Sequence, residues 1–472
     1  MRVSMLNEED IRQIDHAAIR ILEETGMAVY EKQSLDVLEK GGASVDRSTS
    51  RVKIPEKLVR GALESLPRKI TLAGRDESKS VTLGSGESNF MNSLQGVEVL
   101  DLETGERRPS MLSDVAMFAK IVDYLDNIDI FGVTVVAHDV PGELHYVKEL
   151  ATAVENTGKH IIHGCHGTEM TKRYVRIAEI ASGGADALAK RPAVSNFGCT
   201  VSPLQLDRAN TEAMVECAKA GMPYTVLSMA MAGASSPMSL AGNLALITAE
   251  VLGAATICEQ LNPGTPVICG SVSSIMDMRT GVMALGAPER PVINTAVVEV
   301  AHHYGMPVWV GGMSTDGKMP GEQVMMEKVM TGLPPLLAGT DILFGAGLLC
   351  SAMTYSPEQL VIDNELAGAL ARVKKGMKIN SESIALEAID AVGPGGSYLG
   401  MKQTLELFKK DVWMPEFIDR NVYGNWLKLG GRDLREGANE TAKKILKEHN
   451  AKPLEDEQRK EIDEIVEECS KC

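Results

Sequence analysis

The chain has 472 residues, of which 44% are hydrophobic and 24% are charged, and its formal net charge is −16 at pH 7. This length suits one large α/β domain with extensions, and the acidic balance argues against nucleic acid or an anionic membrane as a partner. Residues 1–13 carry charges where a secretory signal needs an apolar run, and the eight Cys lack the spacing of a disulfide framework. We therefore expect a cytoplasmic protein without membrane-spanning segments.

Residues 1–85 are expected to form a helical extension. Apolar side chains recur at helical spacing from Ile11 to Leu22, and Gly26 follows where a helix would end. Two further amphipathic stretches lie at 34–42 and 55–67, and the second begins with a proline and stops before another.

Residues 86–350 alternate between short apolar runs and helical patterns. The runs lie at 88–93, 128–138, 160–166, 193–200, 223–229, 265–271, 306–312 and 341–347. Strands that are buried on both faces read as continuous apolar runs, and eight βα units of this size are typical of a (β/α)8 TIM barrel. A doubly wound open sheet is the alternative, but neither GxGxxG after the first strand nor GxxxxGK[ST] is present.

Residues 351–472 read as a C-terminal helical region. Helical patterns continue to the end of the chain, and the last thirty residues are mostly charged. A charged helix of this kind indicates a solvated surface or a contact between subunits.

One short segment gathers the side chains that metals prefer: His160, His163, Cys165 and His166. Alternation along a strand places His160 and His166 on one face and His163 and Cys165 on the other. The four side chains then cannot meet at one ion, so packing and polar lining are favoured over a metal site. A zinc site built on Cys165 and His166 with ligands from elsewhere stays open as an alternative.

Reactive groups are scarce at the predicted carboxyl ends of the strands, where a barrel enzyme has its active site. No GxSxG nucleophile motif is present, and no apolar run ends in a lysine. This pattern favours an enzyme that positions two reactants whose chemistry needs little proton transfer, so no catalytic acid or base is assigned.

Several stretches resemble a known family. They are 14–30 (IDHAAIRILEETGMAVY), 52–76, 275–307, 311–349, 360–370 (LVIDNELAGAL) and 392–400 (VGPGGSYLG). Taken together, they resemble the trimethylamine methyltransferase family, in its branch without pyrrolysine, the quaternary amine:corrinoid methyltransferases. The resemblance covers nearly the whole chain.

The resemblance implies a barrel enzyme that moves a methyl group from an amine to the Co(I) corrinoid of a small partner protein, without a tightly bound cofactor of its own. It also implies a homo-oligomer. Trimethylamine members carry pyrrolysine in the barrel, whereas this chain has only standard residues, and we place the equivalent position at the exit of the seventh strand near Gly312. A quaternary ammonium already carries the charge that lets it leave as a neutral tertiary amine, so desolvation and alignment suffice.

Aromatic faces are expected to hold the quaternary ammonium, at about 0.5–2 kcal/mol per contact. The candidates on or just past strands are Phe90, Phe131, Phe197, Trp309, Phe344 and Tyr355, with Tyr355 foremost because it follows the eighth strand. Gly312 and Ser314 are expected to line the same pocket.

A betaine donor would need a partner for its carboxylate, and Arg279 or His166 is the candidate. For Arg279, an ion pair with Asp277 or Glu289 is an equally good interpretation. The sequence does not choose among glycine betaine, proline betaine and carnitine. Two other functions stay open, namely a zinc-thiolate methyltransferase and a barrel that binds quaternary amines without converting them.

Overall fold

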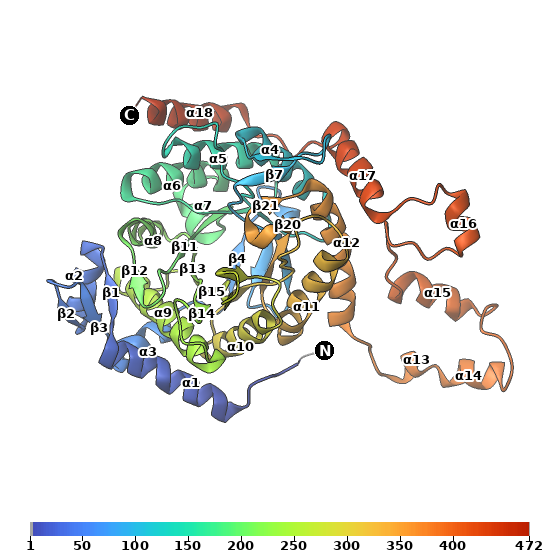
Figure 1. The fold of residues 1–472 in the computed structure, drawn as a ribbon, viewed down its shortest axis with the longest axis horizontal. Coiled ribbons are helices and arrows are strands. Elements are labelled where there is room, and N and C mark those ends of the chain that lie inside the picture. Colours follow the sequence, from blue (N-terminus) through green and yellow to red (C-terminus); the bar gives the residue numbers. More distant parts are fainter. Residues whose placement is uncertain (1–2, 472) are drawn as a thin grey trace.

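In the computed structural model, which describes residues 3–471, eight parallel strands close into a barrel inside a ring of helices (Figure 1). The strands are β6 (Asn89–Asn92), β9 (Ile130–Gly132), β10 (His160–His163), β11 (Val194–Cys199), β13 (Tyr224–Ser228), β15 (Val267–Ser271), β18 (Val308–Gly311) and β19 (Ile342–Ala346). Neighbours in the chain pair with each other, and β19 closes the barrel on β6. The predicted fold class is confirmed, and each strand lies inside one of the predicted apolar runs.

The helices of the ring follow the strands in turn. They are α4 (Leu112–Tyr124), α5 (Leu144–Asn156), α6 (Thr168–Ser182) with the short α7 (Ala185–Lys190), α8 (Arg208–Ala220), α9 (Leu240–Leu261), α10 (Glu289–Tyr304), α11 (Glu322–Ala338) and α12 (Pro357–Lys375). Helix α12 packs on β19, α11 and α4, so it completes the ring. The barrel therefore extends past the predicted boundary at residue 350.

Side chains alternate between the barrel interior and the surrounding helices. On β18, Trp309 points to the interior, whereas Val308 and Val310 pack with the helices. The interior set consists of Met91, Ile130, Ile162, Phe197, Leu227, Ile268, Val272, Trp309, Ile342 and Phe344. A hairpin of β4 (Ile70–Leu72) and β5 (Val81–Leu83) adds Leu72 and Leu83 to the same cluster. It covers the end of the barrel where the strands begin.

The sequence predicts a helical N-terminal extension, but the extension contains both helices and short strands. Its helices are α1 (Glu8–Arg20), η1 (Ile21–Thr25), α2 (Lys32–Gly41) and α3 (Glu56–Ser65), with the 3₁₀ turn η2 (Glu77–Lys79). Three short strands accompany them, β1 (Met27–Val29), β2 (Ser44–Asp46) and β3 (Arg51–Lys53). Strand β1 pairs with β12 (Gln205–Leu206) in the loop after β11, which joins the extension to the barrel.

Helix α9 is apolar on all sides because it is covered on all sides. It packs on β13 and β15 inward and on α1, α2 and α3 outward. With 22 residues it is long and apolar enough to cross a membrane, contrary to the expectation from its sequence, but most of it is buried inside the protein. Full burial explains its composition.

The C-terminal region returns to the barrel only in part. Helix α17 (Leu434–Glu448) packs on α12 and α4, and α18 (Asp456–Ser470) packs on α5 and α6. Residues 376–432, here called the arm, hold α13 (Ser381–Ile384), α14 (Leu386–Val392), α15 (Lys402–Asp411) and α16 (Tyr423–Lys428). The arm stands away from the ring of helices (Figure 1).

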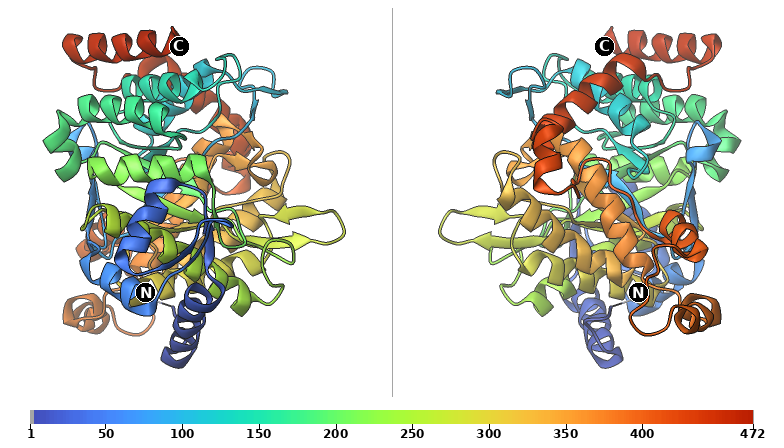
Figure 2. Two further views of the ribbon diagram at one scale, coloured as in Figure 1. Left: turned by 90° about the vertical axis from the view of Figure 1, so that its left-hand side faces the viewer. Right: turned by 90° about the vertical axis from the view of Figure 1, so that its right-hand side faces the viewer.

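Loops at the carboxyl ends of the strands carry two small sheets. One joins β14 (Met231–Ala232), β16 (Ser274–Asp277) and β17 (Val282–Ala284), and its hairpin projects well beyond the barrel (Figure 2). The other joins β7 (Glu98–Leu100), β8 (Arg107–Pro109), β20 (Leu348–Leu349) and β21 (Thr354–Tyr355), beside the turn η3 (Cys350–Ala352). These sheets form walls around the barrel mouth.

Candidate active site at the barrel mouth

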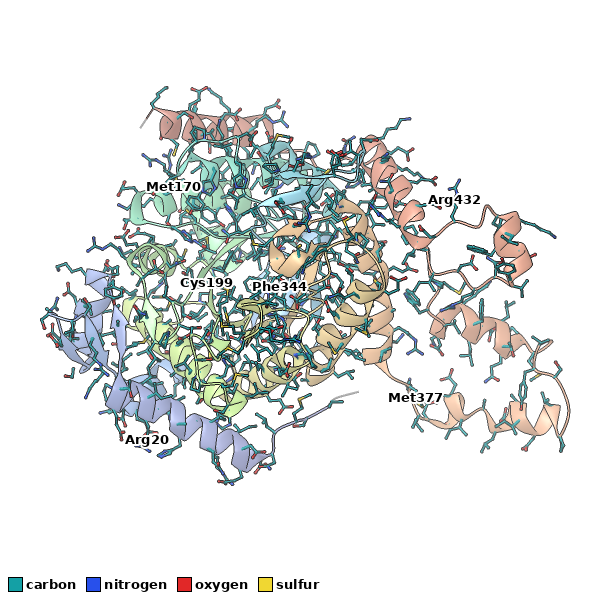
Figure 3. The ribbon with its side chains drawn as sticks, viewed as in Figure 1. Arg20, Met170, Cys199, Phe344, Met377 and Arg432 are labelled. Atoms are coloured by element: carbon teal, nitrogen blue, oxygen red, sulfur yellow. The ribbon has the colours of Figure 1, made fainter. Side chains whose placement is uncertain are left out.

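Three aromatic side chains meet inside the barrel: Phe197, Trp309 and Phe344. The ring centroids of Phe197 and Trp309 are 5.7 Å apart at 84°, and those of Trp309 and Phe344 are 5.4 Å apart at 80°. These are edge-to-face contacts, which aromatic rings prefer. Figure 3 shows Phe344 and Cys199 near the centre of the ring of helices. We call these three rings the aromatic floor of the mouth.

Two glycines above the floor leave room for polar side chains. A Cβ on Gly311 would lie 2.1 Å from Nη2 of Arg290 and 3.2 Å from Cε1 of Phe344. A Cβ on Gly164 would lie 2.9 Å from Nε2 of Gln95 and 3.1 Å from Cε1 of Phe197. The aromatic floor is therefore flanked by a guanidinium on one side and an amide on the other.

Arg290, at the start of α10, is a buried charged group beside the floor. Its side chain is 1% exposed, and Nη1 donates a hydrogen bond to the carbonyl of Val272 at 2.7 Å. Burial lowers the pKa of Arg290 to about 10, so the guanidinium stays cationic at neutral pH. Sequence reasoning missed this residue; the available signal was an arginine between apolar residues at the start of a helix that follows a barrel strand.

Gly312 and Ser314, predicted to line the pocket, face outward instead. A Cβ on Gly312 would lie 2.4 Å from Cδ1 of Leu343 and 3.2 Å from Cα of Gly332 on α11. Ser314 is fully buried, and its hydroxyl donates to the carbonyl of Gly312 at 3.0 Å. The inward position at the exit of the seventh strand is Gly311, one residue earlier than predicted.

Three predicted aromatic candidates are also directed away from the floor. Phe90 and Phe131 belong to the cluster between the barrel and its helices, which is the outer face of β6 and β9. Tyr355 is fully buried; its hydroxyl donates to Oγ of Ser93 at 2.7 Å and to the carbonyl of Leu94 at 2.9 Å. Tyr355 therefore holds the loop after β6 in place through its hydroxyl, and its ring is not available to bind an ammonium group.

Arg279 lies on the projecting hairpin, far out in solvent. Its side chain is 88% exposed, and it binds Asp277 at 2.8 Å. The ion-pair interpretation of this residue is confirmed, and the structure gives no support to a role in holding a substrate carboxylate.

His160 and His163 contact different surroundings, as strand alternation predicts, but His166, past the strand, lies beside Tyr146 together with His163 and not with His160. His160 hydrogen-bonds through Nδ1 to the carbonyl of Pro192 at 3.0 Å and through Nε2 to Ser195 at 2.9 Å. Burial lowers the pKa of His160 to about 4, so it is neutral. On the other face, Nε2 of His163 contacts Oε2 of Glu149 at 2.9 Å. Burial alone would raise the pKa of Glu149, but hydrogen bonds from His145 and His163 lower it to about 2.

Cys165 and His166, the two side chains of the alternative zinc site, contact different parts of the helix layer. Cys165 points into the helix layer, where burial raises the pKa of its thiol to about 12. Nδ1 of His166 contacts the hydroxyl of Tyr146 at 2.9 Å, and burial lowers the pKa of His166. Within residues 3–471, no three His, Cys, Asp or Glu side chains are grouped so that they could hold a metal ion. Neither residue reaches the aromatic floor.

Hydroxyl groups at the ends of β11 and β13 make hydrogen bonds that stabilise the fold. The buried carboxylate of Glu250 on α9 accepts hydrogen bonds from Thr200 at 2.6 Å, Ser228 at 2.8 Å and Ser202 at 2.9 Å. Cys199 borders the floor, but burial raises the pKa of its thiol to about 12, so it is protonated at neutral pH. These groups therefore offer neither a nucleophile nor an acid beside the aromatic floor.

The rim of the mouth is rich in exposed methionine. Five exposed methionines lie in the loops after four barrel strands, with two of them after β13 and one on the projecting hairpin: Met229, Met238, Met278, Met319 and Met353. Methionine is flexible and polarizable, which suits a surface that packs against another molecule.

A separate hollow of about 640 Å³ lies at the opposite end of the barrel, where β18 and β19 begin. Its lining includes Arg68, His302, Asp341 and Lys374. Active sites of (β/α)8 enzymes lie at the carboxyl ends of the strands, so the mouth and not this hollow is the candidate site.

Comparison with known proteins identifies the family. The family model for trimethylamine methyltransferase matches residues 1–471. The chain is 35% identical to a trimethylamine methyltransferase of Methanosarcina acetivorans, over 100% of this chain and 96% of that protein. It is 33% identical to the trimethylamine methyltransferase of Desulfitobacterium hafniense, over 98% and 93% of the two chains. It is 32% identical to a glycine betaine methyltransferase of the same species, over 90% and 89%.

The fold is shared with a solved structure. The monomethylamine methyltransferase of Methanosarcina barkeri aligns with a TM-score of 0.50 and 11% identity, over 93% of each chain. The resemblance of the sequence and the barrel it implied are thus confirmed: the chain belongs to the trimethylamine methyltransferase family.

Proposed function

We propose that the chain transfers a methyl group from a quaternary amine to the Co(I) corrinoid of a small partner protein. The single observation that carries the proposal is the aromatic floor formed by Phe197, Trp309 and Phe344 at the mouth of a methyltransferase-family barrel. Aromatic faces attract quaternary ammonium groups, which cannot donate N–H hydrogen bonds. The glycine betaine methyltransferase among the relatives supports a donor of this class.

The scarcity of reactive groups at the mouth agrees with the chemistry of such a donor. When the C–N bond breaks, its electron pair stays on nitrogen and a neutral tertiary amine leaves, so no proton is transferred. The corrinoid supplies the electron pair for the new bond to the methyl carbon. The chain itself has to align the donor and exclude water, which rigid interior side chains do well.

The methionine rim supports a partner that approaches the mouth from outside. Because the β4–β5 hairpin covers the end of the barrel where the strands begin, a donor resting on the aromatic floor is reached from the end where they finish. The exposed methionines lie in loops at this end of the barrel and can pack against the partner.

The test mixes the purified chain with Co(I) cobalamin, or with a corrinoid protein, and a panel of N-methylated quaternary and tertiary amines. We expect loss of the Co(I) absorption and release of the matching tertiary amine with at least one quaternary donor. Trimethylamine should not react, because its leaving group would be an amide-like anion. Tight binding of quaternary amines without methyl transfer to any Co(I) acceptor would instead support a barrel that only binds them.

A further inference from the structure

The hollow at the end of the barrel opposite to the mouth carries an arginine that the described residues leave unpaired. The guanidinium of Arg68 makes no hydrogen bond or ion pair with any residue from 3 to 471. It lies against the carboxyl end of α10, because a Cβ on Gly305 would be 3.3 Å from its Nε. The carboxyl end of a helix favours a cation, so this charge is held at the wall of the hollow.

A second cation, Lys374, borders the hollow from α12. The carboxylates of Glu87 and Asp341 lie near Lys374, and burial lowers the pKa of the lysine. Asp341 also lines the hollow, but each of its oxygens accepts a hydrogen bond from a backbone N–H group. The two acids therefore offset Lys374, and Arg68 is the charge that remains for a partner from outside.

The hollow combines these charges with apolar surface. Its volume is about 640 Å³, and its lining includes Met306, Pro307 and Leu337, so it can accept several side chains of another segment. The arm begins directly after α12, at the border of the hollow, but among residues 3–471 no residue of the arm lines it. Figure 2 shows the arm on the side of the barrel opposite to the projecting hairpin.

The arm contains a segment that is acidic, apolar and exposed. Residues 379–401, here called the acidic segment, include Glu382, Glu387 and Asp390 but no lysine, arginine or histidine. None of these three carboxylates has a hydrogen bond or an ion pair among the described residues. The exposed apolar side chains of the segment are Ile379, Ile384, Leu386, Ile389, Tyr398 and Leu399. An exposed surface of this kind usually marks a contact with another protein.

We propose that the acidic segment of one copy of the chain docks into the hollow of a second copy. The carboxylates of the segment meet Arg68, and its apolar side chains cover the apolar part of the lining. Complementary charge of this kind fixes the partner and the register of a contact. The partner is another copy because the arm of the same copy stands away from the ring of helices (Figure 1).

This contact predicts how the copies are arranged. Each copy carries both surfaces, so two copies can exchange their arms reciprocally and form a closed dimer. The hollow and the mouth lie at opposite ends of the barrel, so both mouths of the dimer stay accessible. The proposal concerns assembly and does not depend on the identity of the methyl donor.

Charge reversal on either surface tests the contact. Sedimentation velocity over a concentration series gives the dissociation constant of the oligomer. Arg68→Glu places like charges opposite each other and should raise this constant at least about 10-fold. Glu387→Lys combined with Asp390→Lys should do the same from the other side. Arg279→Glu reverses an exposed arginine on the projecting hairpin, far from the hollow, and should associate like the wild type.

A mixture of the two weakened variants decides whether these surfaces face each other. In a mixed dimer, the basic arm of the double variant meets the acidic hollow of Arg68→Glu, and the unchanged arm meets the unchanged hollow. An equimolar mixture should therefore associate at concentrations where each variant alone is monomeric. Thermal unfolding followed by circular dichroism checks that both variants are folded.

Three results would overturn the proposal. They are a monomeric wild type, wild-type association of Arg68→Glu, and a mixture that remains monomeric although each variant is folded. A monomeric wild type that binds inorganic phosphate, and loses this binding in Arg68→Glu, would make the hollow a pocket for a small anion instead.

Discussion

At the scale of single residues, the proposed function makes the aromatic floor the source of affinity for the donor. Phe344→Leu removes a ring face but keeps an apolar side chain of similar size. We expect the apparent KM for a quaternary donor to rise about 3- to 30-fold, which corresponds to about 0.5–2 kcal/mol of cation–π attraction. The measurement is steady-state methyl transfer to Co(I) cobalamin.

Phe90→Leu provides the matched control, because Phe90 is a barrel phenylalanine on the outer face. Both substitutions should lower stability by a similar amount, since each enlarges a packed cluster. An equal rise in KM for both variants would mean that Phe344 acts only through stability, and would remove it from the donor site.

His160 should give stability a defined dependence on pH. Its pKa is about 6.5 in the unfolded chain and is lowered by burial to about 4 in the folded protein. Between these values the unfolded state binds more protons, so the free energy of unfolding falls as pH drops through this window, by up to about 3 kcal/mol. Chemical denaturation at pH 7 and pH 5 measures the difference.

His160→Gln removes the titrating group, so its stability should change less between pH 7 and pH 5 than that of the wild type. The exposed His16 supplies the control, since His16→Gln should leave the wild-type difference in place. A His160→Gln variant with the full wild-type pH dependence would show that other groups cause it.

The residue scale also shows where sequence reasoning stops. Phe197, Trp309 and Phe344 could be predicted as candidates because aromatic residues at strand ends are easily recognised. Phe90 looked equivalent, but a shift of one residue along a strand moves a side chain to the opposite face. The same one-residue parity separates Gly312 from the inward Gly311. Arg290 escaped prediction because an arginine at a helix start usually lies in solvent.

At the scale of elements, a buried ion pair holds the tips of β18 and β19 to α12. Nζ of Lys328 binds Asp363 at 2.7 Å, with both side chains fully buried, and also donates to the carbonyls of Met313 and Gly345. Lys328→Met would leave the Asp363 carboxylate unpaired and should lower the free energy of unfolding by about 3–5 kcal/mol.

Combining this change with Asp363→Asn should recover part of the loss, because the amide is neutral. Exactly additive effects in the double variant would argue against a coupled pair. Lys402→Met, which breaks the exposed pair with Glu406, should change stability by less than about 0.5 kcal/mol.

Elements were predictable where their burial leaves a pattern in the sequence. The eight barrel strands are buried on both faces and therefore appear as continuous apolar runs. Strands β1, β2 and β3 have three residues each, too few to show any period, and β1 depends on pairing with the distant β12. Helix α12 falls in the predicted C-terminal region because it follows the last apolar run, at 341–347; its contacts with β19 and α11 show that it belongs to the ring.

At the scale of the whole molecule, the arm carries apolar side chains that a single copy of the chain leaves exposed to solvent. Apolar side chains of the arm are widely exposed, including Leu399 (91%), Met377 (83%), Tyr423 (73%) and Val422 (71%). Figures 1 and 2 show the arm lying outside the ring of helices. Soluble monomers rarely expose contiguous apolar surfaces of this kind, which usually mark protein contacts.

We therefore predict that the chain forms a homo-oligomer through the arm. Closed symmetric association would pair the apolar residues of one arm with the same surface, or the barrel, of another copy. Size-exclusion chromatography with light scattering should give a mass that is a multiple of 50.8 kDa.

Replacing Leu386 and Leu399 together by Asp should shift the mass toward the monomer, because a buried carboxylate without a partner is strongly unfavourable. Met326→Asp adds a charge to an exposed side chain of α11 outside the arm, and this variant should keep the wild-type mass. A monomeric wild type at micromolar concentration would contradict the prediction and leave the corrinoid partner as the remaining candidate to cover the arm.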